Sequence, residues 1–207
     1  MIVISGVKKG TGFIMNSHFF AMLSRMKYIN RWALMRNTRT ENLCEHSYEV
    51  SMLAHVLAVI GNSRFGGNAD AGLCAMIGMY HDAPEILTGD MPTPVKYNNP
   101  AIREAYKQVE ETAGRKLLGM LPEEFREEYE RLLMPDTGSE EYRIVKAADK
   151  LSAMIKCVEE LAQGNREFAP ARRATERSLR AMKLPAADLF LEEFLPSYAL
   201  TLDELND

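Results

Sequence analysis

Residues 71–85 of the chain read AGLCAMIGMYHDAPE, an apolar stretch that ends in an adjacent histidine and aspartate. The segment from Ala71 to Tyr80 carries no charged side chain and predicts a buried helix. A regular helix would point His81 and Asp82 in different directions, but Pro84 and the loop after it favour a helix end where the two can converge. The stretch therefore predicts a helix that delivers two polar ligands into a helical core.

Apolar residues recur at helical spacing along most of the remaining chain. Phe19, Phe20, Leu23 and Met26 indicate a first helix, and a second is expected after Ser47, with its end at Gly61-Asn62. Further helices are expected at about 101–120, 122–133, 139–163, 170–182 and 186–192. Residues 63–68 and the stretch LTGDMPTPVKYNNP, residues 87–100, predict loops. No run has the alternation of a strand, so the sequence predicts an all-α fold.

The composition is that of one globular domain, with 46% hydrophobic and 26% charged residues in a chain of 207. We expect residues 15–207 to form that domain and residues 1–14 to be a mobile N-terminal extension, because the helical pattern starts at about residue 15. A net charge of −4 argues against a general binder of nucleic-acid polymers or membranes. No apolar run approaches a membrane span, and the N-terminus lacks the features of a signal peptide. Three scattered cysteines indicate reduced thiols and a cytoplasmic location.

Four candidate metal ligands are spread along the helical segments: His46, His81, Asp82 and Asp149. Two imidazoles and two carboxylates suit a divalent transition metal that keeps positions open for water and substrate. A metal of this kind lowers the pKa of water and polarises a phosphoryl oxygen. We therefore expect a metal site between helices of the bundle. The remaining histidines are expected to be core or surface residues: His55 lies on the opposite face of its helix from His46, and His18 sits among phenylalanines at the first helix.

Three segments together resemble the bacterial 5′-deoxynucleotidases of the HD-domain superfamily of metal-dependent phosphohydrolases. They are INRWALMRNTRTENLCEHS at 29–47, MYHDAPEILTGDMPTPVKY at 79–97 and VKAADKLSAMIKCVEELAQGN at 145–165. The resemblance runs from about Met15 to the C-terminus and implies an HD-domain helical bundle. It also implies a cytosolic homodimer that removes phosphate from deoxyribonucleoside 5′-monophosphates. One divalent metal ion would be needed, and Co, Mn, Cu, Fe, Ni or Zn fits these ligands.

The resemblance assigns a role to each matching residue. His46, His81, Asp82 and Asp149 would hold the metal. Glu85 would be the catalytic carboxylate, three residues after Asp82, and Arg31 would orient the phosphate for catalysis. The substrate would be contacted by Arg31, Trp32, His46, Glu85, Asp90, Met91, Pro92 and Thr93. Pro84 departs from the family pattern, which has a small polar residue there; because proline lacks a backbone N–H, it could shift Glu85.

Other functions remain open from the sequence. An HD phosphohydrolase acting on deoxynucleoside triphosphates or signalling nucleotides would need more cations near the metal than these segments clearly offer. An HD oxygenase with two iron ions would need extra ligands, for which only His18 and His55 remain. A non-catalytic HD module that binds nucleotides would not need Glu85. A phosphatase assay on the metal-loaded protein separates this non-catalytic module from an enzyme.

Overall fold

A computed structural model describes residues 17–92, 95 and 99–206 of the chain. These residues form a bundle of helices and no strand, which confirms the all-α prediction. A single isolated bridge pairs Asn30 with Asn42 on either side of the loop that carries Arg31. The predicted extension, residues 1–14, lies outside the described residues.

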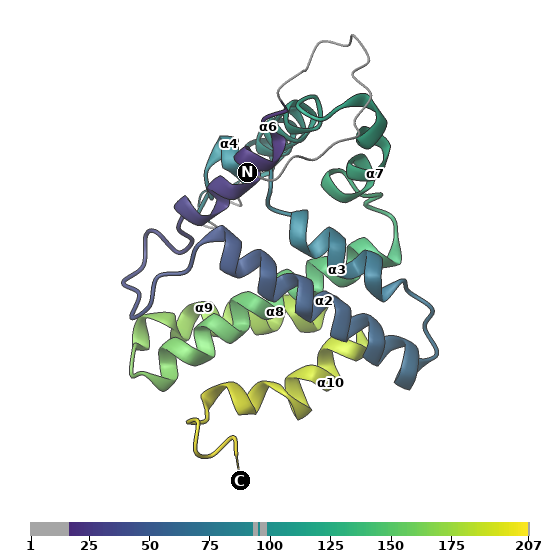
Figure 1. Ribbon diagram of the computed structural model, residues 1–207. Helices are drawn as coiled ribbons and strands as arrows, with labels where there is room; N and C mark the ends of the chain where they lie inside the picture. The colour runs from purple at the N-terminus through teal and green to yellow at the C-terminus, as the bar shows by residue number, and fades with distance from the viewer. Residues whose placement is uncertain (1–16, 93–94, 96–98, 207) are drawn as a thin grey trace, which may run out of the picture.

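Three helices form the centre of the bundle: α2 (Leu43–Phe65), α3 (Ala71–Tyr80) and α8 (Glu140–Ala162). In Figure 1, α2 and α3 run side by side across α8. Gly78 allows this close approach, because a Cβ atom there would lie 3.0 Å from the Cα atom of Ser51. Val50, Leu57, Leu151 and Ile155 are among the fully buried residues of this core.

The second helix is longer than the sequence predicted. It begins at Leu43 rather than after Ser47, because Asn42 and Glu45 form a capping box around its first turn. It continues past Gly61-Asn62 to Phe65 and ends at Gly66, whose φ of 70° is the left-handed conformation typical of a C-terminal glycine. The predicted loop at 63–68 is therefore wrong in its bounds. His46 lies inside the first turns of α2.

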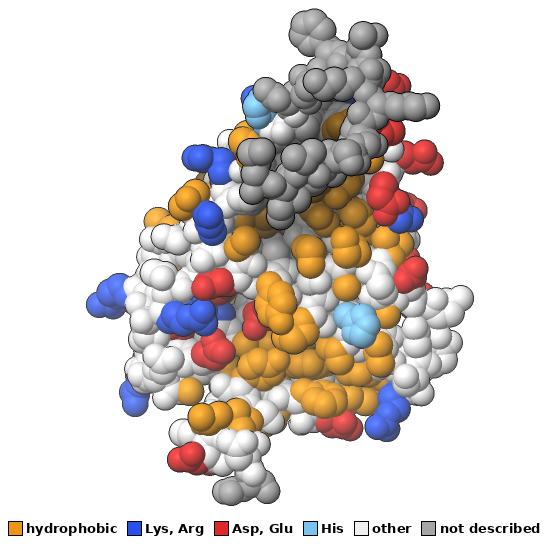
Figure 2. All heavy atoms as spheres, viewed as in Figure 1, with side chains coloured by type: hydrophobic (Ala, Val, Ile, Leu, Met, Phe, Trp, Pro, Cys, Tyr) orange, Lys and Arg blue, Asp and Glu red, His pale blue; other side chains and the backbone are white. Residues whose placement is uncertain are grey.

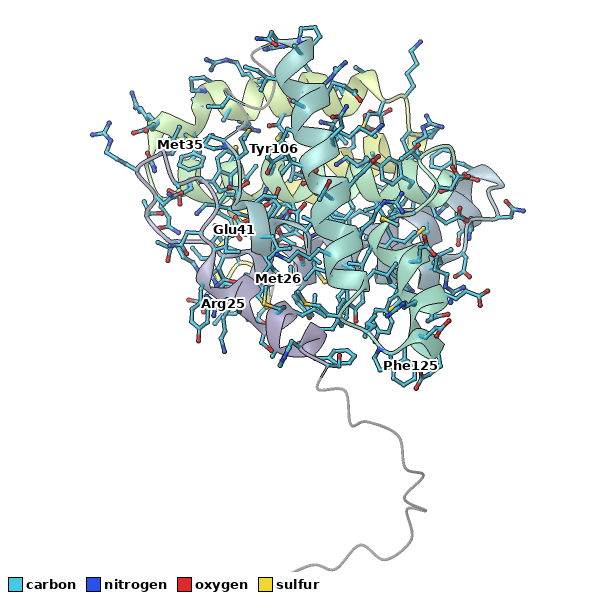
Figure 3. The ribbon with its side chains drawn as sticks, turned by 90° about the horizontal axis from the view of Figure 1, so that it is seen from above. Arg25, Met26, Met35, Glu41, Tyr106 and Phe125 are labelled. Atoms are coloured by element: carbon cyan, nitrogen blue, oxygen red, sulfur yellow. The ribbon has the colours of Figure 1, made fainter. Side chains whose placement is uncertain are left out.

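The remaining helices pack around this centre. A short α1 (Phe19–Leu23) and the 3₁₀ helix η1 (Ser24–Tyr28) lead into the loop before α2. The other elements are α4 (Glu85–Thr88), α6 (Pro100–Leu118), α7 (Glu123–Leu133), η2 (Arg166–Phe168), α9 (Ala169–Ala181), α10 (Pro185–Glu193) and η3 (Leu195–Ala199). Five of the α-helices, α6 to α10, lie within two residues of their predicted ends. Viewed from above, α6 crosses over the bundle with Tyr106 along its length (Figure 3).

A second, smaller core joins α1 to the chain beyond α3. It consists of Phe19, Ala83, Leu117, Leu121 and Leu133. Ala83 belongs to the turn that follows His81 and Asp82, so burial of this turn fixes the position of the pair. None of the helices formed by the described residues combines the length and hydropathy of a membrane span.

Candidate metal centre

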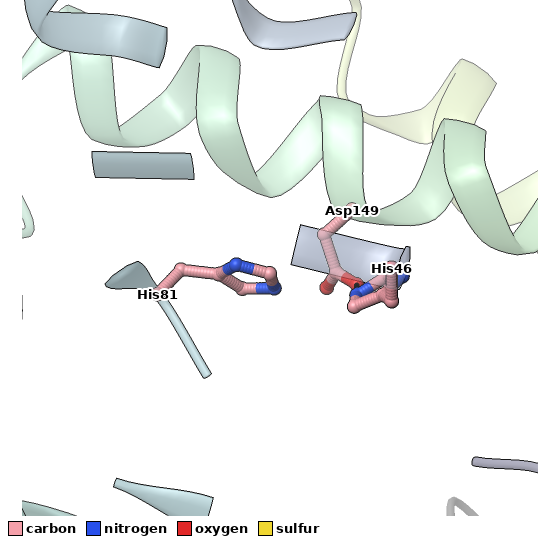
Figure 4. A group of neighbouring side chains, drawn as sticks. All are labelled: His46, His81 and Asp149. Atoms are coloured by element: carbon pink, nitrogen blue, oxygen red, sulfur yellow. Dashed lines mark ion pairs between the residues drawn. The ribbon is translucent and has the colours of Figure 1, made fainter. Parts of the chain in front are cut away.

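The two histidines and Asp149 converge between α2, α3 and α8 (Figure 4). One ligand atom from each of His46, His81 and Asp149 lies within 4.8 Å of the other two. The Nε2 atom of His46 is 3.4 Å from the Asp149 carboxylate, and the two imidazole centroids are 5.2 Å apart. Residues distant in the sequence thus form a compact group of the ligand types that divalent metals prefer.

Asp82 lies beside this group and is shared between two kinds of partner. Its Oδ2 atom is 3.4 Å from His46 Nε2 and 3.2 Å from His81 Nε2. The same oxygen accepts a hydrogen bond of 3.2 Å from Arg31 Nη1. Asp82 therefore connects the imidazoles to the guanidinium group.

The electrostatics keep both aspartates ionised. Burial by itself would raise the pKa of Asp82, but His81 and His46 hold that pKa well below its usual range. Burial would likewise raise the pKa of Asp149, which Lys146, His46 and His81 keep well below its usual range. Two carboxylates that stay charged inside the protein suit a cation.

Both imidazoles present an Nε2 atom to the centre. His81 Nδ1 lies 2.7 Å from the carbonyl oxygen of Gly78, which can only accept, so Nδ1 carries the proton. His46 Nδ1 lies 3.1 Å from the hydroxyl of Ser152. Neither Nε2 atom has a hydrogen-bond partner among the described residues, although both are buried. Buried imidazole nitrogens in this state fit a bound metal ion.

Glu85 is buried beside the histidine-aspartate pair. Pro84 occupies the position just before α4, where its missing N–H leaves no bond unmade, and Glu85 N–H donates to the carbonyl of Asp82 at 2.9 Å. Pro84 is also buried, near Gly114 of α6. The proline is thus accommodated, and Glu85 lines the same cavity as His81 and Asp82.

That cavity has a volume of about 440 Å³ and lies between α3, α4, α6, α7 and α8. Its charged lining is mixed: the cations are Lys107, Arg115 and Lys146, and the acids besides Asp82 and Glu85 are Glu110, Glu111 and Glu130. Lys146 is 3.5 Å from Asp149 Oδ2 and stands one helical turn before it. Lys146 is not among the site residues predicted from the sequence, although its spacing of three residues from a candidate ligand on one helix was a usable signal.

Arg31 is held in place by carboxylates. Its Nε atom donates to Glu41 at 3.0 Å, in addition to the bond from Nη1 to Asp82. Burial alone would lower the pKa of Arg31, but Asp82, Asp149, Glu41 and Asp90 raise it, so the group stays charged. Glu41, labelled in Figure 3, was also absent from the sequence-based site. No sequence pattern identifies it, because its contact depends on how the loop folds.

Trp32 follows Arg31 in a strained backbone conformation, with a φ of 57°. Its carbonyl accepts hydrogen bonds from Met35 N at 2.9 Å and from the side chain of Asn37 at 3.1 Å. Its ring packs on Phe168, with centroids 5.4 Å apart. Strain retained at one residue by several contacts is typical of functional sites.

The other predicted substrate contacts follow α4. The charge of Asp90 contributes to the raised pKa of Arg31. Asp90, Met91 and Pro92 are half-buried, whereas Thr93 lies outside the described residues. The preceding turn is anchored by Tyr106, whose hydroxyl donates to the carbonyl of Gly89 at 3.2 Å. His18 and His55 are exposed, and neither belongs to the group of candidate metal ligands among the described residues.

Solved structures share this fold. An HD-domain phosphohydrolase from Listeria innocua superposes with a TM-score of 0.77 at 23% identity, covering 91% of this chain and 92% of that one. A cyanophage S-2L HD phosphohydrolase, solved with dA and one catalytic Zn²⁺ ion, superposes with a TM-score of 0.58 at 18% identity, covering 86% and 96%. At these identities the likeness shows the HD-domain fold.

Sequence relatives are much closer. A 5′-deoxynucleotidase of Photobacterium profundum is 52% identical over 191 residues, which are 92% of this chain and 98% of the relative. One from Vibrio vulnificus is 51% identical over the same shares of the two chains. The family described as 5′-deoxynucleotidase YfbR-like matches residues 18–198. The resemblance seen in the three segments is thus confirmed, and the chain belongs to the YfbR-like 5′-deoxynucleotidase family.

Proposed function

We propose that this chain is a metal-dependent phosphomonoesterase that converts deoxyribonucleoside 5′-monophosphates into deoxynucleosides and phosphate. The observation that carries the proposal is the convergence of His46, His81 and Asp149. Arg31 binds the neighbouring Asp82, and His81, Asp82 and Glu85 line one cavity. The chain belongs to a family named for this activity, and relatives that are 52% and 51% identical bear the same name. Both findings support the same substrate class.

The four ligands in this proposal are His46, His81, Asp82 and Asp149. A divalent metal held by them would supply positive charge for the phosphate and lower the pKa of water. Co, Mn, Cu, Fe, Ni and Zn all suit imidazole and carboxylate ligands. The zinc ion in the cyanophage phosphohydrolase of the same fold makes zinc the first ion to test.

Arg31 and Glu85 perform the remaining chemistry. Two of the five N–H groups of Arg31 are engaged by Glu41 and Asp82, which fix the plane of the guanidinium so that the others can donate to phosphate oxygens. Glu85 would accept a proton from the attacking water or help deliver one to the departing 5′ oxygen. Its place in the lining of the same cavity as His81 and Asp82 supports this role.

Selection of the deoxy sugar would come from Trp32. An apolar wall by itself rejects an added hydroxyl by only about 10²-fold. A rigid wall that collides with the 2′ oxygen achieves more, and Trp32 is held by Asn37, Met35 and Phe168. His46, Asp90, Met91, Pro92 and Thr93 complete the proposed substrate contacts.

The charge of the cavity favours a monophosphate over a triphosphate. Its three cations, Lys107, Arg115 and Lys146, are outnumbered by the carboxylates of Glu110, Glu111 and Glu130 together with Asp82 and Glu85. A triphosphate would meet repulsion from these acids. The cavity therefore supports a substrate with one phosphate group.

The proposal is tested by measuring phosphate release by the zinc-loaded and manganese-loaded protein. The substrates are dAMP, AMP, deoxyadenosine 3′-monophosphate and dATP. We expect turnover of dAMP and of other deoxynucleoside 5′-monophosphates, with AMP and 3′-monophosphates much poorer. Equal kcat/KM for AMP and dAMP would refute the deoxynucleotidase function, and a preference for dATP would replace it with triphosphate hydrolysis.

We also propose that the enzyme is a cytoplasmic homodimer. Its three free thiols, Cys44, Cys74 and Cys157, suit a reducing compartment. For the dimer, the supporting surface is an exposed apolar stripe on α2 and α3. Figure 2 shows this face, and the stripe comprises Tyr48, Met52, Val59, Met76 and Met79.

A second copy of the chain suits this stripe because its five side chains are uncharged, so self-association would bury no unpaired charge. Sedimentation of the wild type should give a dimer, and Met52→Lys should shift it toward monomer. Val109→Lys, an exposed apolar position on α6, is the matched control and should leave the dimer intact. A monomeric wild type would refute this part of the proposal.

A further inference from the structure

A buried chain of hydrogen bonds runs from His46 to a carboxylate that the proposed chemistry does not use. His46 Nδ1 lies 3.1 Å from the hydroxyl oxygen of Ser152, and that hydroxyl donates to Glu49 Oε2 at 2.5 Å. Both His46 and Ser152 are 1% exposed. Glu49 lies three residues after His46 on α2, whereas Ser152 comes from α8, so the chain spans two helices.

Counting protons along this chain determines the tautomer of His46. A serine hydroxyl has one hydrogen, and an ionised carboxylate only accepts. Because Ser152 donates its hydrogen to Glu49, the Ser152 oxygen can only accept from His46, which requires a proton on Nδ1. With Nδ1 committed to Ser152, Nε2 is the nitrogen that faces Asp82 and Asp149, each 3.4 Å away, and it is the one available to a metal ion.

The opposite tautomer would lose both the hydrogen bond to Ser152 and the open Nε2 atom. A proton on Nε2 would occupy the position that a metal ion needs, and the Nδ1 lone pair would face the Ser152 oxygen. Glu41 does not replace the serine, because its nearest oxygen is 3.5 Å from Nδ1. Hydrogen bonds to the far nitrogen of a ligand imidazole commonly orient the ring in this way.

We propose that Ser152 and Glu49 are positioning residues that fix His46 in the tautomer whose Nε2 binds the metal. The inference rests on the proposed metal centre but not on the identity of the substrate. Glu49 acts only through Ser152, since it orients the hydroxyl, and Ser152 acts on the ring directly. The hydrogen bonds thereby connect α2 and α8 at His46, the first of the proposed ligands in the sequence.

Zinc titration followed by calorimetry, at about pH 8 where carboxyl groups are ionised, tests the proposal. Ser152→Ala should bind Zn²⁺ about 10–100-fold more weakly than wild type. In the zinc-loaded protein labelled with ¹⁵N-histidine, wild type should show a protected Nδ1–H resonance for His46, and Ser152→Ala should lose that protection. Ser47→Ala is the matched control: Ser47 is also buried beside His46, yet its hydroxyl has no partner among the described residues.

A double-mutant cycle separates this role from simple loss of charge. Glu49→Met keeps the length of the side chain, removes both acceptor oxygens and should also weaken Zn²⁺ binding. The double variant should bind Zn²⁺ no more weakly than Ser152→Ala alone, because Glu49 acts through the hydroxyl. Additive losses, or wild-type affinity with a protected Nδ1–H in either single variant, would overturn the proposal. Absence of Zn²⁺ binding by the wild type would instead overturn the metal centre itself, and this inference with it.

Discussion

Replacing Glu160 by glutamine should destabilise the protein and release the loop that carries Arg31 and Trp32. The Glu160 carboxylate is 1% exposed and accepts hydrogen bonds from Thr38 N at 3.0 Å and from Thr38 Oγ1 at 2.8 Å. Lys156 pairs with it and donates to the carbonyl of Arg39 at 2.6 Å. Asn165 adds a bond of 2.8 Å. This one side chain therefore anchors the loop before α2 to the end of α8.

The expected loss of stability follows from the buried positive charge of Lys156, which the substitution leaves without its carboxylate partner. Removing one partner of a buried ion pair costs about 3–5 kcal/mol. Glutamine keeps one acceptor oxygen for Thr38, so we expect the lower end, about 3 kcal/mol. For a chain of this size that corresponds to a Tm lower by about 6–12 °C. The catalytic efficiency should fall as well, because the same loop positions Arg31.

The pH dependence gives a second measurement of the same effect. Burial alone would raise the pKa of Glu160, but Lys156, Thr38 and Asn165 lower it from 4.5 to about 2. A lowered pKa means that the stabilisation is fully present above the usual pKa and is lost as the pH falls toward 2. The difference in Tm between wild type and Glu160→Gln should therefore narrow between about pH 4.5 and pH 2.

Thermal unfolding monitored by circular dichroism is the assay. Glu167→Gln is the control, because Glu167 pairs with Arg36 on the surface, where ion pairs contribute little. The control should melt close to wild type. A Glu160→Gln variant with an unchanged Tm at pH 7, or a Tm difference that does not narrow in acid, would refute the anchoring role.

Four further outcomes are expected for the site. Asp149→Asn should lose metal and activity together, and chelation of wild type should reproduce the loss; full metal content in the variant would remove Asp149 from the ligand set. Glu85→Ala should retain metal and substrate binding but lose about 10²–10⁴-fold in kcat; near-normal turnover would make Glu85 a structural residue. Trp32→Ala should raise kcat/KM for AMP relative to dAMP, measured by phosphate release, and an unchanged ratio would place sugar selection elsewhere. Lys146→Met should raise KM for dAMP and weaken inhibition by inorganic phosphate, since it removes a cation beside Asp149; unaltered KM and inhibition would show that Lys146 only pairs with Asp149.

Local sequence patterns determined most of the helices and the identity of the candidate ligands. The apolar period and the flanking Gly, Pro and Ser residues locate α3 and α6 to α10 within two residues. The second helix was misplaced because its capping box, Asn42 with Glu45, lies in a polar stretch that has little apolar periodicity. His46, His81, Asp82 and Asp149 were selected because few residue types bind metals and because their order matches a known family.

The tertiary structure decided which side chains support those ligands. Nothing in the sequence distinguishes Glu41 or Ser152, and only the packing of α2 on α8 brings Ser152 to His46. Lys146 reaches the cavity through the packing of α8 against α3. The effect of Pro84 on Glu85 was likewise open until the turn around Ala83 was seen to be buried. The physical reason is the separation along the sequence over which each interaction acts. Helical periodicity and capping act between residues a few positions apart, whereas hydrogen bonds between helices depend on how whole helix faces pack.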